Sequence, residues 1–131
     1  MSVTAQAVGS VKLTNNLTGA NSFTTPLNLA YAGTLSSYAQ GFAIASTPTT
    51  ISVPNLSGQF LYIKNLASIA GQNVLVTWTP QGGSTESALT LSAGASIIFC
   101  ESDTTNGITA LSLTATGTTT TGTTVEFLLV G

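Results

Sequence analysis

Apolar and polar residues alternate along most of this chain with the two-residue period of β-strands. In the segment 108–116, Leu111, Leu113 and Ala115 alternate with serine and threonine side chains. This is the pattern of a strand that buries one face and exposes the other to water. No apolar stripe keeps the 3.6-residue period of a helix over three turns. The chain is therefore predicted to be all-β.

Eight short strands are expected, separated by segments rich in glycine, proline and asparagine, the residues that favour turns. The strands are predicted at 34–46, 49–54, 58–65, 73–79, 86–92, 95–101, 108–116 and 123–130. Eight short strands with short connections are typical of a two-sheet antiparallel sandwich or a small barrel. We expect the sandwich.

Three of these segments are apolar at consecutive positions, so both of their faces need cover. They are residues 60–63, 97–100 and 125–130. A two-layer sandwich covers only the face that each sheet turns toward the other sheet. The sequence therefore predicts that something further packs on an outer face of the sandwich.

The first 33 residues differ from the rest, and we divide the chain into an N-terminal segment, 1–33, and a sandwich domain, 34–131. Turn-forming residues at 15–16, 19–21 and 24–26 are expected to break any long element. One short strand is expected at 27–31. The segment is either a first strand plus a loop that wraps the sandwich, or an extended arm that reaches a neighbouring subunit.

Charge is nearly absent: the chain has 131 residues, two lysines, four acidic residues, and no histidine or arginine. Serine and threonine together supply 39 positions, so the surface is polar but almost uncharged. Two lysines cannot neutralise the several phosphates that a nucleic acid presents, nor bind an anionic membrane electrostatically. We therefore expect neither nucleic acid nor membrane as a partner.

Catalytic groups are equally scarce. Nucleophilic catalysis of the Ser-His or Cys-His kind needs a base, and the chain has no histidine. Cys100 ends an apolar run, where a thiol usually serves as a small buried hydrophobe. Glu101 and Asp103 are formally a carboxylate pair, but their turn-forming neighbours indicate a loop. We predict no catalytic residue and no enzyme activity.

One stretch is rich in oxygen ligands, the loop that spans residues 101–107. Calcium accepts carboxylate, amide and carbonyl oxygens, but the spacing fits no EF-hand. A plain loop is the main interpretation of Glu101 to Asn106, with a calcium loop as the alternative. Ligands for zinc or a redox metal are missing. No cofactor is expected.

Trp78 lies in phase with Val74 and Val76 on an alternating strand, which places its ring in the core. The alternative is an exposed ring on which a sugar stacks. Lys64 lies in phase with apolar residues of its own strand. Its stem either follows the apolar surface toward a carboxylate such as Glu126, or it lies in a subunit interface.

Four segments resemble the small β-sandwich proteins of tailed-bacteriophage virions, which include head decoration (cement), minor capsid and spike components. They are Phe60–Leu66, Asn73–Trp78, Leu89–Phe99 and Val125–Val130, with an Asn-Gly loop before the last. The resemblance covers roughly residues 58–130. It implies a jelly-roll-like topology and a virion structural role without catalysis.

The resemblance also implies partners. We expect the protein to bind the major capsid protein or another virion protein, and to form homo-oligomers. The expected interface residues are Phe60, Tyr62, Lys64, Leu128 and Val130. Because no export signal or membrane span is apparent in the sequence, we expect synthesis in the host cytoplasm and assembly into the virion.

Two other functions stay open. A carbohydrate- or receptor-binding module of a fibre or spike would use Trp78 with Tyr31, Tyr38 or Tyr62 as a stacking surface. A subunit of an extracellular filament would also suit a threonine-rich surface with few charges.

Overall fold

A computed structural model describes residues 2–13, 23–33, 36–51, 59–81, 83, 86–100 and 107–131. This described part contains ten β-strands and no helix, so it holds no helix long and apolar enough to cross a membrane. The strands are β1 (Val3–Leu13), β2 (Phe23–Gly33), β3 (Ser36–Ala43), β4 (Thr49–Ile51), β5 (Phe60–Asn65), β6 (Gln72–Pro80), β7 (Ser87–Leu91), β8 (Ser96–Cys100), β9 (Ile108–Gly117) and β10 (Thr124–Val130).

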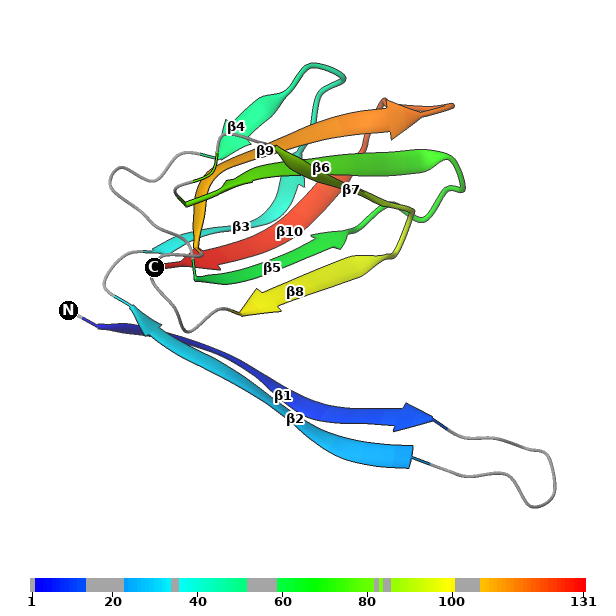
Figure 1. Cartoon of the computed structure of the whole chain (residues 1–131). Helices are drawn as coiled ribbons and strands as arrows, with labels where there is room; N and C mark the ends of the chain where they lie inside the picture. The colour runs from blue at the N-terminus through cyan, green and yellow to red at the C-terminus, as the bar shows by residue number, and fades with distance from the viewer. Residues whose placement is uncertain are drawn as a thin grey trace, which may run out of the picture.

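Strands β3 to β10 form two four-stranded antiparallel sheets, with the orders β3-β10-β5-β8 and β4-β9-β6-β7. The sheets lie face to face as a sandwich (Figure 1). The predicted all-β, two-sheet antiparallel sandwich is confirmed. Each of the eight strands overlaps one of the eight expected segments.

The pairing of these strands follows a regular scheme. β3 pairs with β10, β4 with β9, β5 with β8, and β6 with β7. The chain from β7 to β10 thus retraces, in reverse order, the path from β3 to β6. Two further pairs, β5 with β10 and β6 with β9, join these ribbons into the two sheets.

The main core lies between the two sheets of the sandwich and is built from residues of strands β3 to β10. Leu111, Leu113 and Ala115 of β9 are buried there, as their alternation with hydroxyl residues predicts. Phe42 and Phe127 meet edge to face, with ring centroids 5.7 Å apart. This is a favourable geometry for two aromatic rings.

The N-terminal segment forms a long antiparallel hairpin. β1 and β2 each have eleven residues, and they pair without interruption from Val3 opposite Gly33 to Leu13 opposite Phe23. The expectation of a single short strand at 27–31 is wrong in length. Pro26 does not break β2, because each strand of a two-stranded sheet has one free edge where a missing N–H costs no hydrogen bond. The other two expected breaks lie outside the described residues.

The base of the hairpin packs on the sandwich. Ala5 is buried against Phe60 of β5 and Val130 of β10, on the face of their sheet that points away from the main core. The Tyr31 hydroxyl donates a hydrogen bond to the side-chain oxygen of Gln59. The predicted need for cover on an outer face is thus met, at this end, by the chain itself.

Candidate functional site

A second apolar surface, outside the main core, is the side of the β3-β10-β5-β8 sheet that points away from that core. We call this side the outer face. Strand register brings its residues together, since Tyr62 lies opposite Leu128 on one side and Ile98 on the other. Its members are Ser36, Tyr38, Phe60, Tyr62, Lys64, Ser96, Ile98, Cys100, Glu126, Leu128 and Val130.

The five expected interface residues all lie on the outer face, but in two different environments. Phe60 and Val130 are 2% and 0% exposed, because the hairpin base covers them. Tyr62, Lys64 and Leu128 remain partly exposed. The first two residues therefore hold the hairpin to the sandwich, and the other three are accessible to a partner.

A groove of about 230 Å³ separates the hairpin from the outer face just beyond this covered end. Its lining residues are Gln6, Ala7, Phe60, Tyr62, Ile98 and Leu128. Five of the six carry apolar or aromatic side chains, so the groove suits an apolar occupant rather than a charged one.

A small polar group borders the apolar part of the outer face. The Tyr62 hydroxyl donates a hydrogen bond to the Glu126 carboxylate. Burial, this hydrogen bond and the negative charge of Glu126 together raise the pKa of Tyr62 above its ordinary value of 10.0. Lys64 lies directly opposite Glu126 in the antiparallel register. Opposite charges in that position stabilise a strand pair modestly.

Several large apolar side chains are exposed on the outer face and on the hairpin. Tyr38 and Ile98 lie on the outer face, and Val8 and Val11 lie on the hairpin at 70% and 50% exposure. Sequence reasoning missed Ile98 and both hairpin valines as surface residues. The alternation of apolar and polar residues over 3–7, with Val11 in phase, is the signal that could have identified β1 and its buried face.

Trp78 does not face this surface. It is partly buried and packs against the main core, opposite Leu111 of β9. Cys100 packs beside the hairpin base. Its thiol donates a weak hydrogen bond to the carbonyl oxygen of Ala30, with Sγ at 3.9 Å from that oxygen. Both positions are those of packing residues.

The structure does not test the expectations for the loop at 101–107, neither the carboxylate pair nor the calcium loop. Residues 101–106, which include Glu101 and Asp103, lie outside the described residues. Within the described ranges, no three His, Cys, Asp or Glu side chains are grouped as metal ligands would be.

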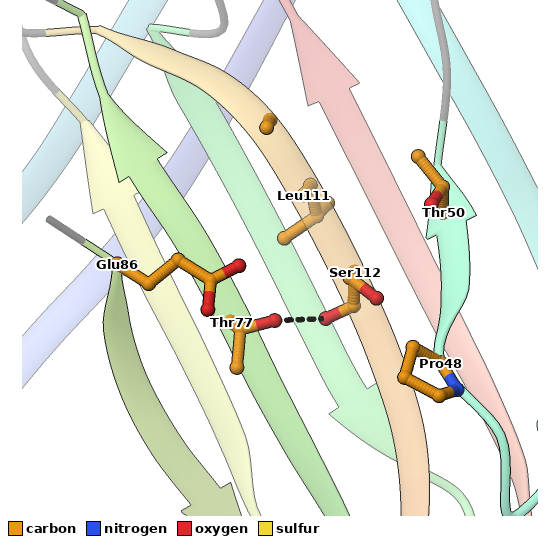
Figure 2. Close-up of a pocket in the computed structure, with 7 residues that line it drawn as sticks. Pro48, Thr50, Thr77, Glu86, Leu111 and Ser112 are labelled. Atoms are coloured by element: carbon orange, nitrogen blue, oxygen red, sulfur yellow. Dashed lines mark hydrogen bonds between the residues drawn. The ribbon is translucent and has the colours of Figure 1, made fainter. Parts of the chain in front are cut away.

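A second depression, of about 260 Å³, lies on the other sheet (Figure 2). Its lining residues are Pro48, Thr50, Thr77, Glu86, Ala110, Leu111 and Ser112. The Thr77 hydroxyl donates to the backbone oxygen of Ser112 at 3.5 Å, a long hydrogen bond. Hydroxyls and one carboxylate around a shallow depression suit a ligand that carries hydroxyl groups.

The two surfaces differ in chemistry: one is an apolar sheet face beside a projecting hairpin, the other a small hydroxyl-lined depression. No protein-family model, curated protein or solved structure matches the chain.

Proposed function

We propose that this protein is a non-enzymatic structural component of a virion, either a capsid decoration (cement) protein or a minor capsid protein that binds and stabilises a protein lattice. The observation that carries the proposal is the hairpin. Its base packs on the outer face of the sandwich, while its exposed valines and the adjacent apolar groove lack cover within the described residues.

A hairpin of this kind favours an assembly role because two isolated strands are only marginally stable in water. The packed base accounts for the first residues of β1 and the last residues of β2. The remainder of the hairpin gains stability only when another surface covers it. Exposed apolar patches beside polar surroundings are typical of protein contact sites.

The strand pairing supports the same role through the fold. We infer that the sandwich is a jelly roll, in which a long ribbon of four strand pairs rolls up into two sheets. The pairing of β3–β6 with β10–β7 in reverse order supports this inference. Jelly rolls occur in viral capsid proteins, but also in lectins and cupins, so this support is an analogy of fold.

The low net charge supports an assembly role because copies of the chain repel each other only weakly. A net charge of −2 gives weak repulsion between copies, so close packing of many copies in a lattice costs little electrostatically. Contacts would then depend on apolar burial and hydrogen bonds.

The test is the protein composition of particles purified on a density gradient from a culture that produces this chain. We expect peptide mass spectrometry to find the chain in a fixed ratio to the major capsid protein, in a copy number that matches a set of symmetry-related positions. Absence of the chain from purified virions would overturn the proposal.

The hydroxyl-lined depression favours a second candidate, carbohydrate binding on a fibre or spike. Sugars bind through arrays of hydroxyl and carboxylate hydrogen bonds of the kind that Thr50, Thr77 and Glu86 can offer. A glycan array probed with the purified chain tests it. Binding that Thr77→Val and Glu86→Gln both abolish supports this function, and an array without signal excludes it.

A further inference from the structure

Three hydroxyl side chains form one row across the β4-β9-β6-β7 sheet, on the side that points away from the main core. Thr50 of β4 pairs with Ser112 of β9, and Ser112 pairs with Thr77 of β6, so all three lie on the same side of the sheet. Neighbouring strands are about 4.8 Å apart, so the row spans about 10 Å. All three residues line the depression of about 260 Å³ shown in Figure 2.

The Ser112 hydroxyl has no hydrogen-bond partner within the described part of the chain. Its oxygen is buried and unpaired, although the backbone oxygen of the same residue accepts the long hydrogen bond from Thr77. Buried hydroxyls in proteins usually have a partner. Rotation about a single side-chain bond turns this hydroxyl toward the depression, where a ligand can complete its hydrogen bonding.

Glu86 contributes a negative charge to the lining of the same depression. It directly precedes β7, and Figure 2 shows its side chain extending toward Thr77. The chain has two lysines and no arginine or histidine, and Lys12 lies in β1 and Lys64 in β5. Neither strand belongs to this sheet. A carboxylate with no basic side chain in its own sheet favours a ligand that carries the positive charge itself.

The depression also has apolar surface, to which Pro48 and Ala110 contribute. Sites for small ligands typically combine apolar walls with a few polar groups that orient the ligand. A pyranose ring has the matching division, since it carries C–H groups on its faces and hydroxyls around its rim. A volume of about 260 Å³ is just below the usual range for drug-sized ligands, which limits the ligand to about one such ring.

We propose that this depression binds an amino sugar, one pyranose ring that carries a free ammonium group. The ammonium group donates to the Glu86 carboxylate, and the ring hydroxyls form hydrogen bonds with Thr77 and Ser112. The C–H groups of the ring lie against Pro48 and Ala110. This inference rests on the second candidate function, carbohydrate binding, and identifies the class of sugar.

The ammonium group separates this class of ligand from neutral sugars. Hydrogen bonds to an ionised group are roughly twice as strong as those between neutral groups. Because Glu86 is exposed, water weakens this attraction, and we expect a preference of about fivefold for the amino sugar over the neutral one. A single ring in an open depression is expected to bind with a dissociation constant of about 1 mM or weaker.

The experiment is an NMR titration of the isotope-labelled full chain, in which amide shifts report both the affinity and the location of the ligand. The probes are glucosamine, glucose, which has the hydroxyls alone, and butylamine, which has the ammonium group alone. The variants are Glu86→Gln and Thr77→Val. Glu126→Gln is the control for net charge, since Glu126 lies in the other sheet. Thr90→Val is the control for the hydroxyl, since Thr90 is an exposed residue of the same sheet outside the depression. The spectrum of each variant verifies its fold.

Glucosamine is expected to shift the amides around the depression and to bind about fivefold more tightly than glucose or butylamine. Glu86→Gln should reduce its affinity about fivefold and Thr77→Val about threefold, whereas the two controls should leave it unchanged.

Equal affinities for glucosamine and glucose would overturn the inference and leave carbohydrate binding in place. Equal affinities for glucosamine and butylamine would overturn it as well, because the hydroxyl row would then contribute nothing. Absence of binding by all three probes would also overturn it, while the glycan array tests carbohydrate binding and the composition of purified particles tests the virion role independently.

Discussion

Asn65, at the end of β5, shows how a single polar residue fixes the junction of three strands. It is fully buried, and its amide nitrogen donates to the backbone oxygens of Gln72 at 2.8 Å and Leu91 at 3.1 Å. Its side-chain oxygen accepts a hydrogen bond from the N–H of Ala67 at 3.0 Å. One side chain thus satisfies three backbone groups that would otherwise be unpaired in the interior.

Asn65→Leu is expected to lower the free energy of unfolding by about 3 kcal/mol, since each buried backbone group left without a partner costs about 1–3 kcal/mol. Urea denaturation measures the change. Asn28→Leu is the control, because Asn28 makes an exposed hydrogen bond with Gln6. It should change stability by about 0.5 kcal/mol or less. Equal losses in the two variants would refute the role of Asn65.

Tyr62 links stability to alkaline pH. Because burial and Glu126 raise its pKa, the folded state favours the neutral phenol. The resulting stabilisation is complete below the unfolded pKa of about 10 and is lost as the pH rises through the higher folded pKa. In Tyr62→Phe, this alkaline loss of stability should become smaller. The comparison is the urea midpoint at pH 8 against pH about 10.5.

Tyr38→Phe is the control for that series, since it removes an exposed hydroxyl and leaves Tyr62 in place. Its alkaline profile should match the wild type. If Tyr62→Phe also kept the wild-type profile, the link between Tyr62 and alkaline stability would be wrong.

At the scale of elements, the hairpin base depends on a close approach of two glycines. A Cβ on Gly33 would come within 2.5 Å of the carbonyl oxygen of Gly131 and 2.9 Å of the Tyr31 ring. No real side chain tolerates such distances, so the end of β2 and the C-terminus touch only because Gly33 lacks a Cβ.

Gly33→Ala is expected to lower the free energy of unfolding by about 1–3 kcal/mol through overpacking. It should also speed hydrogen exchange of the β1 and β2 amides, as the base separates from the sandwich. Gly9→Ala is the same substitution in the same hairpin, where the new Cβ meets open space. It should leave exchange unchanged. Similar exchange in both variants would show that the hairpin does not depend on this contact.

The sandwich strands could be predicted from sequence because one face of each joins a large core, which imposes a period of two on residues such as Leu111 and Leu113. The hairpin strands could not be predicted in this way. Its strands have small and polar residues, and Pro26 suggests a break that a free strand edge tolerates. Alternation over so few large side chains gives a weak signal.

The candidate site could also be predicted only in part from the sequence. Apolar residues on both faces of β5 and β10 indicate an outer contact, which made Phe60 and Val130 candidate interface residues. The sequence does not reveal what makes that contact, because pairing between segments far apart depends on the whole fold. The chain's own hairpin covers these two residues.

For the whole molecule, the low charge predicts how assembly responds to salt. With six charged residues in 131, few ion pairs can contribute to contacts between copies or with a lattice. Association through the outer face and hairpin should therefore survive about 1 M NaCl, where the Debye length is about 3 Å. Sedimentation of virions or oligomers through salt gradients measures it, and release of the chain by salt alone would contradict it.

The central claim is the proposed structural role in a virion, and electron cryomicroscopy of particles purified from a culture that produces this chain tests it most directly. We predict density for the eight-stranded sandwich at symmetry-related positions on the shell or tail, with the hairpin in contact with neighbouring protein. A complete virion map in which every density is accounted for by other proteins would contradict a structural role in the virion.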